Sequence, residues 1–110
     1  MALQNTNPTT TKAWEKLQQH FQTMQTASMK EMFSEDASRA AKFHIKWEDF
    51  LVDYSKNRIN QETINLLLEL ANEVNLKQAI ASYFDGQAIN QTENRAVLHT
   101  ALRAPEKATI

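Results

Sequence analysis

The densest group of polar side chains is the segment Asp53-Tyr-Ser-Lys-Asn-Arg58, which follows a β-prone run at the point where a loop should begin. Loops positioned by regular elements often carry function. A catalytic serine needs a base placed to take its proton, but Ser55 is followed directly by Lys56, which is not the spacing of a Ser-x-x-Lys motif. The segment therefore favours a structured turn that satisfies its own backbone groups, with a catalytic role as the alternative.

Three potential cations, Arg95, His99 and Arg103, recur at intervals of four residues. On a helix this spacing places them along one stripe. Such a stripe could bind an anion or an acidic partner surface. An ordinary solvated helix face is the simpler interpretation, and both remain open from the sequence.

The histidines and the adjacent acidic residues give no compact constellation. His20, His44 and His99 lie on three different predicted elements, so a metal site would have to be assembled entirely by the fold. Glu48 and Asp49 are neighbours, and neighbours on a strand or tight turn point to opposite sides, so they do not face one substrate as an acid/base pair. We therefore assign no catalytic, cofactor-binding or metal-binding residue, and no cofactor.

Composition narrows the class of protein. The 110 residues allow one domain, and 42% hydrophobic with 23% charged residues is typical of a globular chain. A net charge of −1 argues against binding to nucleic acid or an anionic membrane. The absence of cysteine excludes disulfides and thiolate chemistry, and a single glycine, Gly86, cannot build a Gly-rich phosphate loop. No secretory pattern or membrane-spanning run occurs, so we expect no export and no membrane partner.

Apolar residues at helical spacing, preceded by capping residues, predict helices in the first 42 positions. The first begins between positions 7 and 11 and ends near Gln25. Ser28 with Glu31 forms a capping box before a second, short helix. A weak helical turn follows from Asp36 to Lys42.

The period then becomes alternating. Phe43, Ile45 and Trp47 share one side, and the run Phe50–Tyr54 follows. The two-residue connection between them lacks the glycine or asparagine of a tight hairpin turn, so the strands form either a pair or two separate short elements. Two strands alone are marginal in water, so we expect them to need a further layer.

The second half again predicts helices. Asn60 and Asn75 are the expected N-caps of two of them, and either Asn90 or Thr92 caps a last helix that runs through Leu102. The helix after Asn60 has an apolar arc of about 160°. That arc consists of Ile64, Leu67, Leu68, Leu70, Ala71 and Val74. So broad an arc requires more packing partners than this chain supplies.

Beyond these periodicities, three segments resemble segments of a known family. They are Asn7-Pro-Thr-Thr-Thr, Leu51-Val-Asp-Tyr-Ser-Lys-Asn-Arg-Ile59 and Ile89-Asn-Gln-Thr-Glu-Asn-Arg-Ala-Val-Leu-His-Thr-Ala-Leu-Arg103. In order and spacing they resemble the N-terminal region of the glucose-6-phosphate isomerase family. The resemblance extends from Asn7 to Arg103.

The resemblance implies a homodimeric, cofactor-free aldose–ketose isomerase of glycolysis and gluconeogenesis, located in the cytoplasm. Members interconvert glucose 6-phosphate and fructose 6-phosphate through a cis-enediol intermediate, on two α/β/α sandwich domains. The residues that bind phosphate, open the ring and move the proton lie beyond the point where this sequence stops. This chain is therefore expected to be an N-terminal piece, with the rest of the isomerase as its partner and a sugar phosphate as substrate only of the parent enzyme.

The expected fold is mostly α with one or two short β-strands, as the N-terminal segment of an α/β/α sandwich enzyme. Residues 1–42 are predicted to be helical, 43–58 short strands and a polar loop, 59–103 helical, and 104–110 a C-terminal stub. The resemblance makes the helix predicted over residues 92–103 a docking element for the rest of the enzyme. The isolated chain is expected to be inactive and to expose apolar faces. The alternative is a free-standing small helical module that binds another protein.

Overall fold

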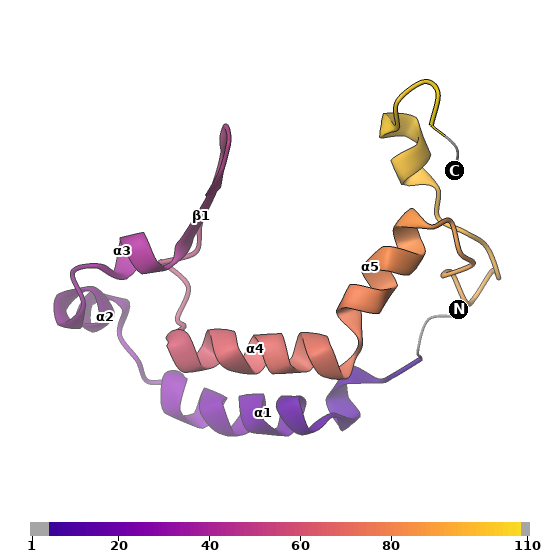
Figure 1. The fold of residues 1–110 in the computed structure, drawn as a ribbon. Helices are drawn as coiled ribbons and strands as arrows, with labels where there is room; N and C mark the ends of the chain where they lie inside the picture. The colour runs from indigo at the N-terminus through magenta and orange to yellow at the C-terminus, as the bar shows by residue number, and fades with distance from the viewer. Residues whose placement is uncertain (1–4, 109–110) are drawn as a thin grey trace.

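The computed structural model describes residues 5–108, in which helices flank a single two-stranded sheet (Figure 1). In chain order the elements are η1 (Pro8–Thr10), α1 (Lys12–Met24), α2 (Met29–Glu35), α3 (Arg39–Lys42), β1 (His44–Trp47), β2 (Phe50–Asp53), α4 (Gln61–Glu73), α5 (Leu76–Phe84) and η2 (His99–Arg103), η1 and η2 being 3-10 turns. The predicted fold class, mostly helical with two short strands, is confirmed. None of the helices described is both long and apolar enough to cross a bilayer.

The molecule has an open shape. Helices α1 and α4 lie side by side and antiparallel, and the β1–β2 hairpin and α5 rise from opposite ends of this pair on the same side (Figure 1). The radius of gyration is 18.4 Å. A compact domain of this length would have a radius of about 13 Å. The chain therefore leaves much of its surface without an internal packing partner.

The α1–α4 pair supplies most of the small core. Ala13 and Met24 from α1 and Leu66 from α4 are buried. At one end of the pair, Glu73 accepts hydrogen bonds from the backbone N–H groups of Ala13, at 2.8 Å, and Lys12, at 3.1 Å. A carboxylate at a helix N-terminus accepts from backbone N–H groups that have no partner within the helix, and its negative charge interacts favourably with the helix dipole. Glu73 thus fixes the register of α4 against α1.

Local capping follows the sequence prediction at three helices. The backbone N–H of Trp14 donates to Thr11 Oγ1 at the start of α1, and that of Glu31 donates to Ser28 Oγ at the start of α2, which is one half of the predicted capping box. Asn60 and Thr63 form a reciprocal capping box at α4. These caps could be predicted because the residues that form them lie three positions apart in the sequence.

Asn75 is the N-cap residue of α5, as the sequence predicts, but it does not cap through its side chain. Its side chain makes no cap hydrogen bond, and its backbone is left-handed, with φ 60°. The N–H groups of Val74 and Asn75 instead bond back to Leu70 and Asn72, so the residue closes α4 and turns the chain into α5. Asparagine is one of the few residues that occupies this conformation readily.

The two strands form a tight antiparallel hairpin, so they are a pair and not two separate short elements. Trp47 pairs with Phe50 across a two-residue turn in which Glu48 has φ 52°. The rings of Trp47 and Phe50 stack with centroids 5.7 Å apart and an interplanar angle of 19°. This aromatic pair offsets the cost of a positive φ at a residue with a Cβ atom.

The helix predicted over residues 92–102 is not formed. Asn90 and Arg95 make an antiparallel bridge, and Asn94 between them has φ 53°, which reverses the chain. Only η2 is helical, and Leu102 at its end is 84% exposed. A short helix without a packing surface is marginal in water, so the turn between Asn90 and Arg95 forms instead. The predicted helical stretch 59–103 is therefore helical only through α4, α5 and η2.

Candidate functional site

A buried guanidinium organises the loop after β2. Arg39 is 4% exposed and donates from Nε to the carbonyl of Ser55 at 2.8 Å, from Nη1 to Ile59 at 2.9 Å and from Nη2 to Asn57 at 2.7 Å. The planar guanidinium presents its donors in a fixed fork. Three carbonyl groups of one loop are thereby held at set positions against α3.

The same guanidinium lies against two aromatic rings. Its central carbon is 4.8 Å from the ring centroid of Phe43 and 5.6 Å from that of Phe33. Aromatic faces attract a cation at such distances. Within residues 5–108 no carboxylate forms an ion pair with Arg39, so carbonyl dipoles and ring faces balance its charge.

The polar segment that sequence analysis singled out forms the structured turn it predicted. Asp53 Oδ1 accepts from the backbone N–H of Ser55 at 2.9 Å and from its hydroxyl at 2.6 Å. The hydroxyl bond and then the backbone bond lower the pKa of Asp53. Ser55 is 1% exposed, so a substrate has no access to its oxygen. The turn orders the backbone that Arg39 holds.

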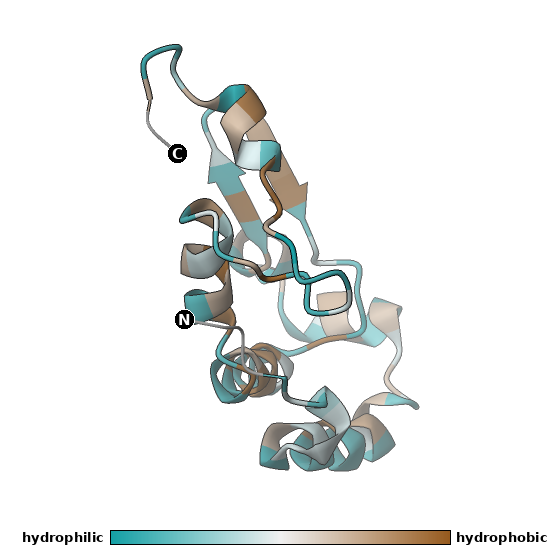
Figure 2. Ribbon diagram, turned by 90° about the vertical axis from the view of Figure 1, so that its right-hand side faces the viewer, coloured by the Kyte–Doolittle hydropathy of each residue, from teal (hydrophilic) through white to brown (hydrophobic). Residues whose placement is uncertain are grey.

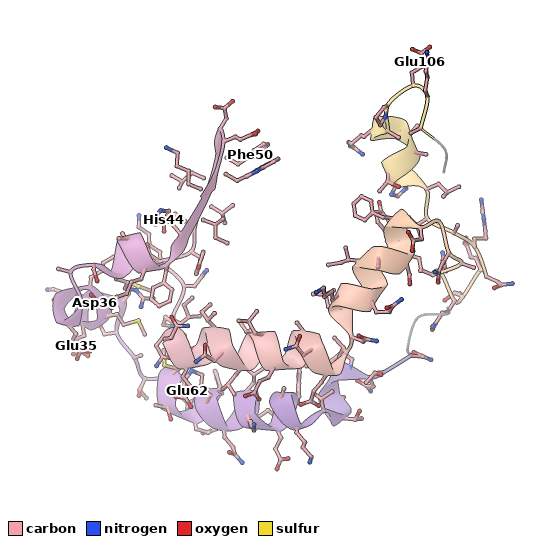
Figure 3. The ribbon with its side chains drawn as sticks, in the orientation of Figure 1. Glu35, Asp36, His44, Phe50, Glu62 and Glu106 are labelled. Atoms are coloured by element: carbon pink, nitrogen blue, oxygen red, sulfur yellow. The ribbon has the colours of Figure 1, made fainter. Side chains whose placement is uncertain are left out.

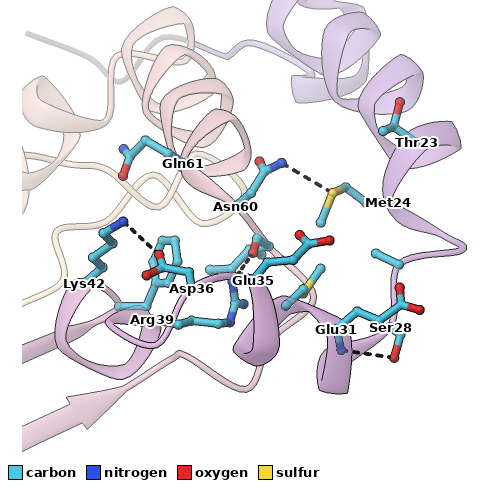
Figure 4. Close-up of a pocket in the computed structure, with 14 residues that line it drawn as sticks. Thr23, Met24, Ser28, Glu31, Glu35, Asp36, Arg39, Lys42, Asn60 and Gln61 are labelled. Atoms are coloured by element: carbon cyan, nitrogen blue, oxygen red, sulfur yellow. Dashed lines mark hydrogen bonds and ion pairs between the residues drawn. The ribbon is translucent and has the colours of Figure 1, made fainter.

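A groove of about 500 Å³ opens beside Arg39, between the end of α1, α2, α3 and the start of α4 (Figure 4). Met24, Met32 and Phe43 give it an apolar part. Its polar rim includes Glu31, Glu35, Asp36 and Lys42. Three of these rim side chains are carboxylates, and the cation among them, Lys42, is paired with Asp36, so the rim is unsuited to an anionic substrate.

Asp36 should make α3 sensitive to acid. Its ion pair with Lys42 Nζ at 2.8 Å, and then its bonds from Ser38, lower its pKa from the ordinary 3.8 to about 2. A lowered pKa stabilises the fold above pH 3.8, and this contribution is lost as pH falls toward 2. Helical circular dichroism of the chain should fall across this window. Asp36→Asn should flatten the dependence, and Lys42→Met should shrink it; a profile unchanged in both variants would refute the assignment.

His20 joins the two long helices. It is 7% exposed, with Nε2 2.6 Å from Thr63 Oγ1 and Nδ1 3.5 Å from a carboxylate oxygen of Glu62. The hydroxyl it contacts belongs to the capping box of α4. His44 instead contacts the carbonyl of Ala40, at 2.9 Å. Residues 5–108 hold no group of three or more histidine and acidic side chains arranged for a metal ion.

The predicted cationic stripe is wrong. Arg95 lies in the turn before η2, 3.7 Å from Glu93, and its side chain is 75% exposed. His99 and Arg103 are the first and last residues of η2. A 3-10 helix has three residues per turn, so positions four apart point about 120° away from each other. The three side chains do not share one face.

Sequence reasoning missed Arg39 and Glu73. An arginine in a weak helical turn and a glutamate near a helix end are both typical of solvated surfaces. Their partners lie 16 or more residues away along the chain, at Ser55 and Ala13 respectively. No local pattern marks such residues. The arrangement positions backbone segments, and Ser55, its best-placed nucleophile, is sealed from solvent.

Comparison with known proteins supplies the context. The family model for phosphoglucose isomerase matches residues 53–110. A curated relative, glucose-6-phosphate isomerase from Christiangramia forsetii, is 60% identical over 108 residues, which cover 98% of this chain and 20% of the relative. The chain thus spans about a fifth of the length of this relative.

Proposed function

The chain belongs to the phosphoglucose isomerase family, and on that basis we propose that it forms the N-terminal part of a glucose-6-phosphate isomerase. The observation that carries this proposal is 60% identity sustained over 98% of the chain. The whole enzyme would interconvert glucose 6-phosphate and fructose 6-phosphate in glycolysis and gluconeogenesis. Its homodimeric state and cytoplasmic location belong to the same proposal.

Within that enzyme, the role of this chain is structural support. Moving a proton between adjacent sugar carbons needs a positioned base and a group that stabilises the enediolate. The most ordered polar side chains described here already have other tasks: Asp53 and Ser55 bond to each other, and Arg39 holds three backbone carbonyls. The catalytic groups would therefore come from the four-fifths of the enzyme that the match does not cover.

This proposal predicts that the purified chain does not turn over fructose 6-phosphate, because it assigns the catalytic groups to the four-fifths of the enzyme that the match does not cover. A coupled assay measures this directly. A chimera in which this chain replaces the matching 108 residues of the Christiangramia forsetii enzyme should be active. Turnover by the isolated chain that survives removal of host isomerase would overturn the supporting role. An inactive but folded chimera would count against the family function.

The sequence also left open a free-standing interaction module. Neither the family match nor the fold adds support to that alternative. A stable complex of the isolated chain with an unrelated protein, together with an inactive chimera, would favour it.

A further inference from the structure

The hairpin is amphipathic, and its apolar face is uncovered. The strand register places four large apolar side chains on one face. They are Ile45, Trp47, Phe50 and Val52, which are 59%, 63%, 66% and 57% exposed. The opposite face carries His44, Lys46, Leu51 and Asp53. Figure 3 shows the labelled Phe50 projecting toward the side on which α5 stands.

Helix α4 presents apolar residues to the same side. Its Leu66 is buried in the α1–α4 pair, while Leu67 and Leu68 are 46% and 59% exposed. One and two residues along a helix correspond to rotations of about 100° and 200°, so Leu68 points away from α1 and Leu67 points to one side of it. Figure 1 shows that the hairpin and α5 rise from this side.

Helix α5 completes the arrangement. Leu76, Ile80 and Phe84 recur at intervals of four and are 48%, 50% and 62% exposed. Ser82, which is fully buried, lies about 200° around the helix from both Ile80 and Phe84. Its carbonyl accepts from Gln87 in the segment after α5, and that segment lies on the side of α5 away from the hairpin (Figure 1). The apolar stripe of α5 therefore faces the hairpin.

The exposed apolar residues named above on the hairpin, α4 and α5 together form one surface, here called the inner apolar surface. Helix α4 is its base, and the hairpin and α5 stand at the two ends of that base. Figure 2 shows β2 as hydrophobic over most of its length. An exposed apolar surface of this extent marks an interaction site. A two-stranded sheet also needs a further layer for stability.

The shape of the surface selects its occupant. A twofold dimer needs a patch that is complementary to itself. The hairpin and α5 stand on either side of the base (Figure 1), so two copies placed face to face by a twofold axis would meet at these two elements and leave α4 uncovered. The occupant must be convex and apolar. The curated relative has about five times the length of this chain, because the matched stretch is 20% of it.

We propose that the inner apolar surface receives an apolar helix or sheet layer from the four-fifths of the isomerase polypeptide that the match does not cover. This inference rests on the proposed function. The occupant covers the hairpin, α4 and α5 at once, and it holds the hairpin upright beside α5.

Cysteine labelling tests the proposal, because the chain itself contains no cysteine. Ile45→Cys places a thiol on the apolar face of the hairpin, and Lys46→Cys is the matched control on the opposite face. Ile80→Cys is a second probe, on α5. Each variant is made in the isolated chain and in the active chimera, and reaction of the introduced thiol is followed by peptide mass spectrometry.

We expect Ile45→Cys and Ile80→Cys to react at least about 100-fold more slowly in the chimera than in the isolated chain, with much less protection of Lys46→Cys. Equal rates in chain and chimera for both probes would overturn the inference even if the chimera is active. Protection as strong as in the chimera, in an isolated chain that forms a defined dimer, would identify a second copy as the occupant and also overturn it. An inactive parent chimera would instead count against the proposed function, a result that activity measures separately from labelling.

Discussion

Replacing Arg39 by alanine is expected to release the loop between Ser55 and Ile59. The substitution removes three hydrogen bonds to backbone carbonyls and leaves those of Ser55 and Ile59 without their donor, whereas that of Asn57 still accepts from the N–H of Ile59. Each of the two carbonyls left unpaired costs about 1 to 3 kcal/mol, so a total loss of about 2 kcal/mol or more is expected. The loss of packing against Phe33 and Phe43 adds to it.

Amide hydrogen exchange measures this effect at the site. The N–H groups of Asn57 and Ile59, which bond within the loop, should exchange roughly a hundredfold faster in Arg39→Ala. Arg39→Lys keeps the charge but cannot span three carbonyls, so it should recover only a small part of the protection. Arg58→Ala is the matched control, because Arg58 makes one exposed bond to Gln25. Equal protection in Arg39→Ala and the unsubstituted chain would show that the Asp53–Ser55 turn alone holds the loop.

The second large effect concerns the isolated chain in solution. With its inner apolar surface uncovered, it should combine a strong helical circular dichroism signal with binding of a hydrophobic dye. A broad thermal transition or concentration-dependent oligomers should accompany these, because apolar faces associate when they lack partners. A sharply melting monomer that does not bind the dye would contradict this expectation.

Two substitutions in the hairpin locate the cause. Ile45→Lys places a charge on the inner apolar surface, whereas Leu51→Lys places one on the opposite face. The two side chains are similar in size and in exposure, at 59% and 64%. Ile45→Lys should lower dye binding by roughly half, and Leu51→Lys should have a much smaller effect. Equal effects would show that the dye does not distinguish the two faces of the hairpin.

The local elements could be predicted because their causes lie within a few residues. The starts of α1, α2 and α4 follow from Thr11, Ser28 and Asn60, each of which accepts from an N–H three residues further on. The alternation that begins at Phe43 likewise marks the strands. The predicted turn at Asp53–Ser55 needed only a carboxylate two residues before a serine.

The errors lie where the outcome depends on packing. Asn75 begins α5 with a left-handed backbone and without a side-chain cap, and Asn94 makes a left-handed turn where a helix was predicted. The apolar residues after Thr92 have the spacing of a helix, but Leu98 is 48% and Leu102 84% exposed, so they bury too little surface to hold one. Helical period alone does not hold a short helix, since most helix stability in proteins comes from tertiary contact.

The sequence by itself determined helices α1, α2, α4 and α5, the side-chain caps of the first three of them, the strands β1 and β2, and the resemblance on which the family assignment was first based. Only the tertiary structure decided that Arg39 is buried and holds the loop after β2, and that Glu73 caps a helix about 60 residues away. It also decided that apolar residues of the hairpin, α4 and α5 face one side. The reason is the range of the interactions. Caps, turns and periodicity act between near neighbours, whereas these contacts join groups that become neighbours only when α1 packs on α4 and the loop after β2 folds over α3.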